Sequence, residues 1–182
     1  VMKFDGLELV HYCHPDCGPL LNIMRLSKEE AFALAGKMAE EHPKTTAFYR
    51  FADFENYYAL RVVQDKFLYE RFLKLGGKPE TEHPLSFVIE GSDYLKEWFG
   101  DGIEIKLALK EIASEHISFT IGDSGSGYQR DGSVEVLTKQ ELKKRVEEAG
   151  GFEDFLNMTG KHYIEVQLWS DQYILSYRNQ EV

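Results

Sequence analysis

The segment His162-Tyr-Ile-Glu-Val-Gln-Leu-Trp169 alternates between aliphatic side chains and polar or aromatic side chains. A period of two is typical of a β-strand with one buried face. We expect Ile164, Val166 and Leu168 to point toward the core. The opposite face then carries Tyr163, Glu165, Gln167 and Trp169.

Other short apolar runs also predict strands, because turn residues bound them. They span residues 7–12, 85–89, 103–107 and 117–121. A further run at 173–177 is expected to pair with residues 162–169 across a turn at 170–172.

Two strong helices are predicted ahead of most of these strands. Ser27-Lys-Glu-Glu30 is a capping box, and it opens a helix that ends at His42-Pro43. A longer helix runs from Phe54, with Asp53 as its N-cap, to about Leu75. Its apolar residues lie almost all round, so we expect it to be central and largely buried. Shorter helices are predicted from 16 to 24, 93 to 98, 139 to 149 and 152 to 158.

Helices therefore dominate the first half of the chain and strands the second. This order favours an α+β fold over a doubly wound α/β sheet. We expect a single globular domain, residues 1–182, in which a mostly antiparallel sheet packs against two or three helices.

Composition narrows the classes of function. The net charge of −10 disfavours nucleic acid as a partner, because phosphate backbones are also negative. No apolar run is long enough to span a membrane, and the first residues lack a charged-then-apolar leader. With two cysteines, the fold cannot depend on a disulfide framework. We therefore expect an acidic, aromatic-rich cytoplasmic protein.

The most reactive stretch is His11-Tyr-Cys13-His14-Pro-Asp-Cys17. If a helix began near Asp16, its dipole would lower the pKa of the Cys17 thiol. Zinc binds histidine nitrogens and cysteine sulfurs of the kind found in this stretch. Structural zinc sites, however, usually draw one pair of ligands from each of two separate stretches, and we find no second pair of histidines or cysteines in the sequence. We therefore expect no zinc at His11, Cys13, His14 and Cys17. Locally hydrogen-bonded histidines beside small thiols are the simpler interpretation.

Gly122-Asp-Ser-Gly-Ser-Gly127 contains the sequence Gly-Asp-Ser-Gly, which surrounds the nucleophilic serine of chymotrypsin-like serine proteases. Those enzymes are paired β-barrels, and this chain is too short for two barrels together with its helices. The segment also lacks the Gly-Lys-Ser/Thr that completes a phosphate loop, and no helix is expected directly after it. A flexible loop, which would also suit a lid over a cleft, is the prediction.

Glu165 is the third candidate for a functional site, after the His11–Cys17 stretch and the Gly122–Gly127 segment. A carboxylate and an amide between two large aromatic residues suit a planar ligand with hydroxyl groups. A solvated edge strand with amphipathic rings is the alternative.

The opening Leu9-Val-His11-Tyr12-Cys13, followed by Leu20-Leu21-Asn-Ile23-Met, resembles the first strand and helix of ADP-ribosyltransferase-like domains of the His-Tyr-Glu type. The resemblance implies NAD as substrate, with His11 at the ribose and Glu165 as the catalytic carboxylate. Residues expected to contact NAD on this basis are Tyr12, Tyr163, Gln167 and Trp169. Cys13 stands where that family has Thr or Ser, and the family's stacking Tyr is replaced by Ser86 or Phe87.

The middle of the chain is rich in aromatic residues, at 48–51, 57–58 and 98–99. With Arg50 or Arg61 these rings would form a pocket for a carboxylate or phosphate. Core packing around the long helix is the simpler interpretation. A non-catalytic module that binds a basic protein partner through exposed aromatics and acidic charge also stays open.

Overall fold

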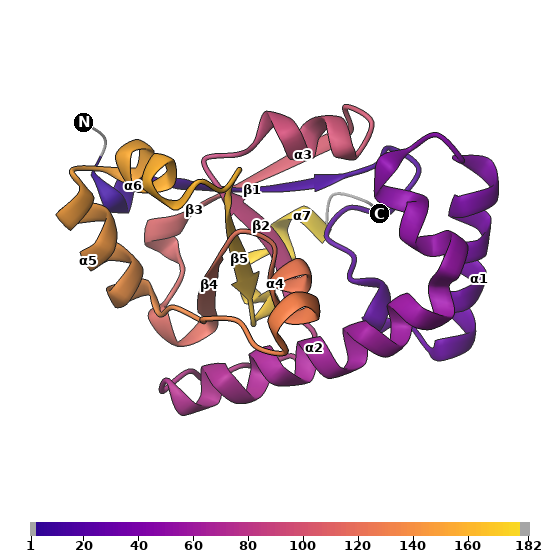
Figure 1. Ribbon diagram of the computed structural model, residues 1–182, viewed down its shortest axis with the longest axis horizontal. Helices are drawn as coiled ribbons and strands as arrows, with labels where there is room; N and C mark the ends of the chain where they lie inside the picture. The colour runs from indigo at the N-terminus through magenta and orange to yellow at the C-terminus, as the bar shows by residue number, and fades with distance from the viewer. Residues whose placement is uncertain (1–2, 179–182) are drawn as a thin grey trace.

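The computed structural model describes residues 3–178, and its centre is a 5-stranded sheet in which every neighbouring pair is antiparallel (Figure 1). The strand order is β3-β1-β2-β5-β4. The strands are β1 (Glu8–Cys13), β2 (Leu85–Ile89), β3 (Ile103–Ala108), β4 (Ile117–Ile121) and β5 (Ile164–Leu168). The predicted α+β fold with a mostly antiparallel sheet is confirmed.

Helices surround this sheet and make up most of the remaining structure. The α-helices are α1 (Lys28–Glu41), α2 (Phe54–Lys74), α3 (Asp93–Trp98), α4 (Ser124–Asp131), α5 (Lys139–Ala149), α6 (Phe152–Thr159) and α7 (Leu175–Arg178). The 3-10 helices are η1 (Phe4–Gly6), η2 (Ile23–Arg25), η3 (Thr46–Asp53), η4 (Leu109–Glu111), η5 (Ser114–His116) and η6 (Asp171–Tyr173). None of the helices in residues 3–178 has the length and apolar character needed to cross a membrane.

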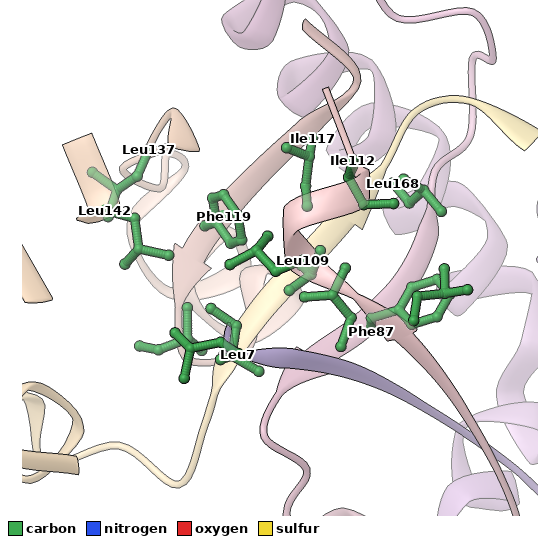
Figure 2. Close-up of a cluster of buried hydrophobic side chains, with 14 of the residues drawn as sticks. Leu7, Phe87, Leu109, Ile112, Ile117, Phe119, Leu137, Leu142 and Leu168 are labelled. Atoms are coloured by element: carbon green, nitrogen blue, oxygen red, sulfur yellow. The ribbon is translucent and has the colours of Figure 1, made fainter. Parts of the chain in front are cut away.

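One face of the sheet forms the main hydrophobic core. Phe87 of β2, Val166 of β5 and Phe119 of β4 lie in register across these neighbouring strands, and all are buried. Figure 2 shows Phe87 and Phe119 among the buried side chains of this core. Helices α5 and α6 cover this face through Leu142, Val146 and Phe155. The expectation that Ile164, Val166 and Leu168 face the core is confirmed, since each is 0% exposed.

The long helix α2 is placed differently from the prediction. It lies along the outside of the molecule, and Val62, Val63 and Leu73 are exposed (Figure 1). Its buried side includes Gln64 and Asp65 as well as Leu68 and Phe72. The helix has apolar residues on several sides because its first and second halves pack in different hydrophobic clusters. The expectation of a central, largely buried helix was wrong.

Three local predictions were also wrong. Residues 16–22 form turns before η2 rather than a helix, because Cys17 N–H closes a turn on the His14 carbonyl and Leu20 adopts a positive φ of 55°. Tyr173 ends η6, Ile174 is a bend and residues 175–177 lie in α7, so the run 173–177 pairs with no strand. The Gly122–Gly127 segment is largely helical, since it opens α4.

The capping box before α1 is present as predicted. The Ser27 hydroxyl accepts a hydrogen bond from Glu30 N–H at 3.1 Å, and the Glu30 carboxylate accepts one from Ser27 N–H at 3.3 Å. Replacing Ser27 with Ala leaves an N–H at the helix start without its partner, so Ser27→Ala should lower the free energy of unfolding by about 1 kcal/mol. Urea denaturation measures this. A loss no larger than that of the exposed neighbour change Lys28→Ala would contradict the assigned cap.

Candidate functional site

The face of the sheet opposite the main core borders a cavity of about 310 Å³. The sheet supplies its inner wall through Val88, Glu165 and Gln167. Helix α2, the 3-10 helix η3, helix α3 and the start of α4 supply the other walls. Polar and aromatic side chains line it together, as is usual for small-molecule sites. Its side chains include Arg50, Tyr57, Gln64, Tyr94, Trp98, Asp123, Ser124 and Tyr163.

Glu165 is the buried acid of this cavity. Its Oε2 accepts hydrogen bonds from Gln167 Nε2 at 2.6 Å and Thr120 Oγ1 at 3.2 Å. Its Oε1 accepts one from the backbone N–H of Ser124 at 3.3 Å. A side chain two residues along β5 and one on the neighbouring strand β4 therefore fix its carboxyl group, and the first residue of α4 also holds it through its backbone N–H.

Burial raises the pKa of Glu165 from its ordinary value of 4.5 to about 7, and the negative charge of Asp123 adds to the shift. The hydrogen bonds from Ser124 and Gln167 oppose the shift but do not cancel it. A carboxyl group with a pKa near neutrality can donate or accept a proton at physiological pH, which is the property of a general acid or base.

This raised pKa also predicts how stability depends on pH. The folded chain holds a proton on Glu165 up to about pH 7, whereas the unfolded chain releases it near 4.5. Stability is therefore lost progressively as the pH rises from about 4.5 to about 7, and the loss, about 2 kcal/mol once partial exposure to the cavity is allowed for, stays constant above pH 7. Glu165→Gln, which cannot ionise, should gain this amount relative to the natural protein as the pH rises from about 4 to about 8, as measured by urea denaturation. A stability difference that is constant with pH would contradict the assignment.

Asp123 caps α4 and lies beside this group. Gly122 adopts a positive φ of 77°, which turns the chain out of β4, and the Asp123 carboxylate accepts hydrogen bonds from Gly125 N–H at 3.0 Å and Ser126 Oγ at 2.8 Å. The predicted loop is thus a tight strand-to-helix turn that brings α4 to Glu165. A β-carbon on Gly125 would approach Gln64 Oε1 to 3.2 Å, so glycine allows this close contact with α2.

Arg50 supplies the positive charge of the cavity. Its Nη2 lies 3.5 Å from the Asp123 carboxylate, and its Nε donates to the Tyr49 hydroxyl at 3.1 Å. The guanidinium carbon lies 5.7 Å from the Tyr57 ring centre and 5.8 Å from that of Trp98. Aromatic faces on several sides hold the guanidinium in place, as cation–π contacts do. The pocket of aromatic residues with Arg50 or Arg61, which the sequence left as the alternative to core packing, corresponds to this cavity, since both arginines line it. The Arg61 guanidinium is occupied by Asp65 and Tyr57, which leaves Arg50 as the cation for a ligand.

The residues predicted to share the outward face of β5 have separate roles. Tyr163 lines the cavity, and burial raises its pKa, so its hydroxyl stays protonated. Gln167 is 1% exposed and binds Glu165, Thr120 and Ser118, so it positions the carboxyl group. Trp169 is 0% exposed, and its Nε1 donates to Ser118 Oγ at 2.8 Å, so it is a packing residue beneath α2 and cannot contact NAD. The alternative of a solvated edge strand was wrong, because β5 lies between β2 and β4.

His11 does not take the position expected of it. Strand β2 lies between β1 and β5, and residue alternation puts His11 on the side of Leu9 and Phe87, opposite to Glu165. The ring borders the cavity, but its Nδ1 contacts the Ser86 carbonyl at 2.8 Å and its Nε2 accepts from Leu20 N–H at 3.2 Å. Burial lowers its pKa, so the ring is neutral. His11 therefore connects three backbone segments and has no ring nitrogen left for a ribose hydroxyl.

Tyr12 lies on the cavity side of β1, on the same face of the sheet as Glu165. Its hydroxyl accepts a hydrogen bond from Ser92 N–H at 2.7 Å, and its ring packs in a cluster with Val10 and Val88. The hydroxyl therefore anchors the start of α3, while the ring forms part of the cavity wall.

The two cysteines behave as partly buried thiols. Neither Cys13 nor Cys17 is in a disulfide. Burial raises the pKa of Cys17 to about 11, and its Sγ contacts Met38 Sδ at 3.6 Å. The expectation of a lowered thiol pKa was wrong, because the helix it required does not form.

None of the protein-family models, curated proteins or solved structures compared with this chain matches it.

Proposed function

We propose that this chain is an enzyme that cleaves a glycosidic bond of a nucleotide, with Glu165 as its catalytic carboxylate and NAD as the specific substrate to test. The observation that carries the proposal is the Glu165 carboxyl group, held by three hydrogen-bond donors at the wall of a cavity with a pKa of about 7. Such a group serves either to exchange a proton or, when ionised, to stabilise positive charge at a sugar carbon.

The cavity suits a ligand that combines a planar ring with an anionic group. Rings from η3, α2 and α3 offer apolar faces for stacking, and the fixed guanidinium of Arg50 suits a phosphate or carboxylate. A volume of about 310 Å³ is near the lower limit for small-molecule sites and is matched to one nucleoside half of a dinucleotide.

A second hollow continues from the first and gives room for the other half. It shares Arg50, Tyr94, Asp123 and Tyr163 with the cavity, and Lys161 and His162 also line it. Arg130 is there too, but it is paired with Asp131 at 2.8 Å. The basic side chains provide partners for a diphosphate, and the carboxylates of Asp123, Asp131 and Glu135 in the same lining balance their charge.

The proposed reaction follows from these positions. The bond between the ribose carbon and the ring nitrogen breaks, and its electron pair neutralises the positive ring, which leaves as nicotinamide. Ionised Glu165 stabilises the positive charge that develops on the ribose. Water or another hydroxyl then forms the new bond to the same carbon, and its proton passes to the Glu165 carboxylate. A bound cationic ring would itself favour the ionised form of Glu165.

The resemblance to ADP-ribosyltransferase-like domains agrees with this use of Glu165 and fails at His11. In this proposal the ribose is held by groups that face the cavity, namely Tyr163 and Gln64, whose Oε1 is buried without a hydrogen-bond partner in the described structure. An unsatisfied buried acceptor of this kind is suited to a ligand hydroxyl.

Calorimetry with NAD, combined with proton NMR detection of released nicotinamide, tests the proposal directly. Binding at millimolar ligand or below and slow release of nicotinamide are expected. Arg50→Ala should weaken NAD binding by about tenfold, because a charge-assisted hydrogen bond contributes about 1.5 kcal/mol or more. The exposed Arg71→Ala on α2 is the matched control. A flat titration without nicotinamide release would overturn the proposal and leave a partner-binding role for this chain.

A further inference from the structure

A second cluster of reactive side chains lies near the end of α1. Its His14 also borders the cavity that contains Glu165, whereas its other two members are not among the lining residues. His14 and Asp16 follow β1, and His42 is the residue at which α1 ends. One possible ligand atom from each of the three lies within 4.8 Å of the others. The fold therefore brings His14 and His42 together from two distant parts of the chain. The sequence alone did not predict this proximity.

Contacts within this cluster orient the rings. His42 Nε2 lies 2.8 Å from Asp16 Oδ2, and Asp16 N–H donates to His14 Nδ1 at 3.1 Å. The His14 and His42 ring centres are 4.4 Å apart, and Phe48 packs against both at 5.2 and 5.7 Å. The apolar ring of Phe48 fixes both imidazoles on one side, so the cluster is preorganised.

His42 Nε2 gives a second, independent indication. This atom is buried and has no hydrogen bond with proper geometry among the described residues, although the Asp16 carboxylate is close to it. A buried nitrogen without an aligned partner is costly, and such groups in native proteins call for an explanation such as an ion. A metal ion between the nitrogen and the carboxylate oxygen would satisfy both.

We propose that His14, Asp16 and His42 bind one divalent transition-metal ion, of which Zn²⁺ is the best match. Two imidazole nitrogens and one carboxylate oxygen form a ligand set that zinc accepts. Three protein ligands leave a fourth position for water or another small ligand. Burial and the neighbouring His42 lower the pKa of His14, so its ring is neutral at physiological pH, as a metal ligand must be.

The thiols are not part of this site. Cys17 lies next to Asp16 in sequence, but its sulfur contacts Met38 and stays protonated. Its Sγ is also not among the atoms that lie within 4.8 Å of one another. The site thus differs from the set His11, Cys13, His14 and Cys17, for which no zinc was expected, because the second stretch of ligands comes from the end of α1.

Zinc titration of the untagged full chain, after dialysis against a chelator, tests the site by calorimetry and native mass spectrometry. One ion per chain is expected. Asp16→Asn and His42→Asn should each lower the affinity by at least about tenfold. The Asp16 side chain is mostly exposed, so Asp16→Asn keeps the test valid if His42→Asn fails to fold. Circular dichroism checks the fold of both.

Two matched controls separate this site from other sources of binding. Cys17→Ser removes the adjacent thiol, and Glu41→Gln removes an exposed carboxylate beside His42, and both should bind zinc like the natural protein. The proposal is wrong if no ion binds with one-to-one stoichiometry, if Cys17→Ser abolishes binding, or if Glu41→Gln weakens it as much as Asp16→Asn does. None of these results depends on whether the cavity at Glu165 turns over NAD.

Discussion

Glu165→Gln is expected to lower the rate of nicotinamide release by about 10²–10⁴-fold, the usual contribution of a positioned acid or base. Glutamine keeps the shape of the side chain and one acceptor oxygen for Gln167 and Thr120. It cannot carry the negative charge that stabilises a developing oxocarbenium ion, nor take up a proton from the attacking hydroxyl. The measurement is release of nicotinamide from saturating NAD, followed by NMR.

The same variant distinguishes catalysis from binding. In the proposed reaction Glu165 acts on a charge that exists only in the transition state, so the loss should fall on kcat, with KM changed little. Glu153→Gln, an exposed carboxylate on α6, is the matched control and should keep full activity. If Glu165→Gln raises KM and leaves kcat intact, the carboxylate binds substrate and is not catalytic.

Strand β5 shows which features of the fold the sequence predicts and which it does not. Alternation placed Ile164, Val166 and Leu168 on one face and Glu165 on the other, because a strand has a fixed period of two. Whether that other face is wet depends on the neighbouring elements. Only the strand order places β5 inside the sheet, and only the packing of α2 buries Trp169.

His11 illustrates a second limit. Its side of the sheet follows from the pairings of Val10 with Val88 and of Val88 with Glu165. A register change of one residue would have moved His11 to the other face, and registers between distant strands leave no local signal in the sequence. The sequence also did not predict that Asp123 is the N-cap of α4. The Gly- and Ser-rich composition of residues 122–127 is typical of a loop, so no helix was expected there.

A buried ion-pair network next to the cavity also escaped the sequence. Asp65 on α2 is 1% exposed, and its carboxylate accepts hydrogen bonds from Arg61 Nε and Nη2, both at 3.3 Å. His83 Nδ1 lies 2.7 Å from the same carboxylate, and Arg61 also donates to the Tyr57 hydroxyl at 2.8 Å. Burial alone would raise the pKa of Asp65, but Arg61 and His83 outweigh it and hold the pKa below its ordinary value. The network ties α2 to the segment before β2.

Asp65→Ala should therefore lower the free energy of unfolding by about 3–5 kcal/mol, because it leaves the Arg61 guanidinium buried without a counter-charge. Urea denaturation at neutral pH measures the loss. Glu70→Ala on the same helix is the control, since its pair with Lys66 is exposed with 3.9 Å between the charged atoms and should contribute less than about 1 kcal/mol. The double change Arg61→Met with Asp65→Leu removes both charges, so it should cost less than Asp65→Ala alone. A loss for Asp65→Ala as small as that for Glu70→Ala would show that water reaches Arg61 and that the pair is not buried in solution.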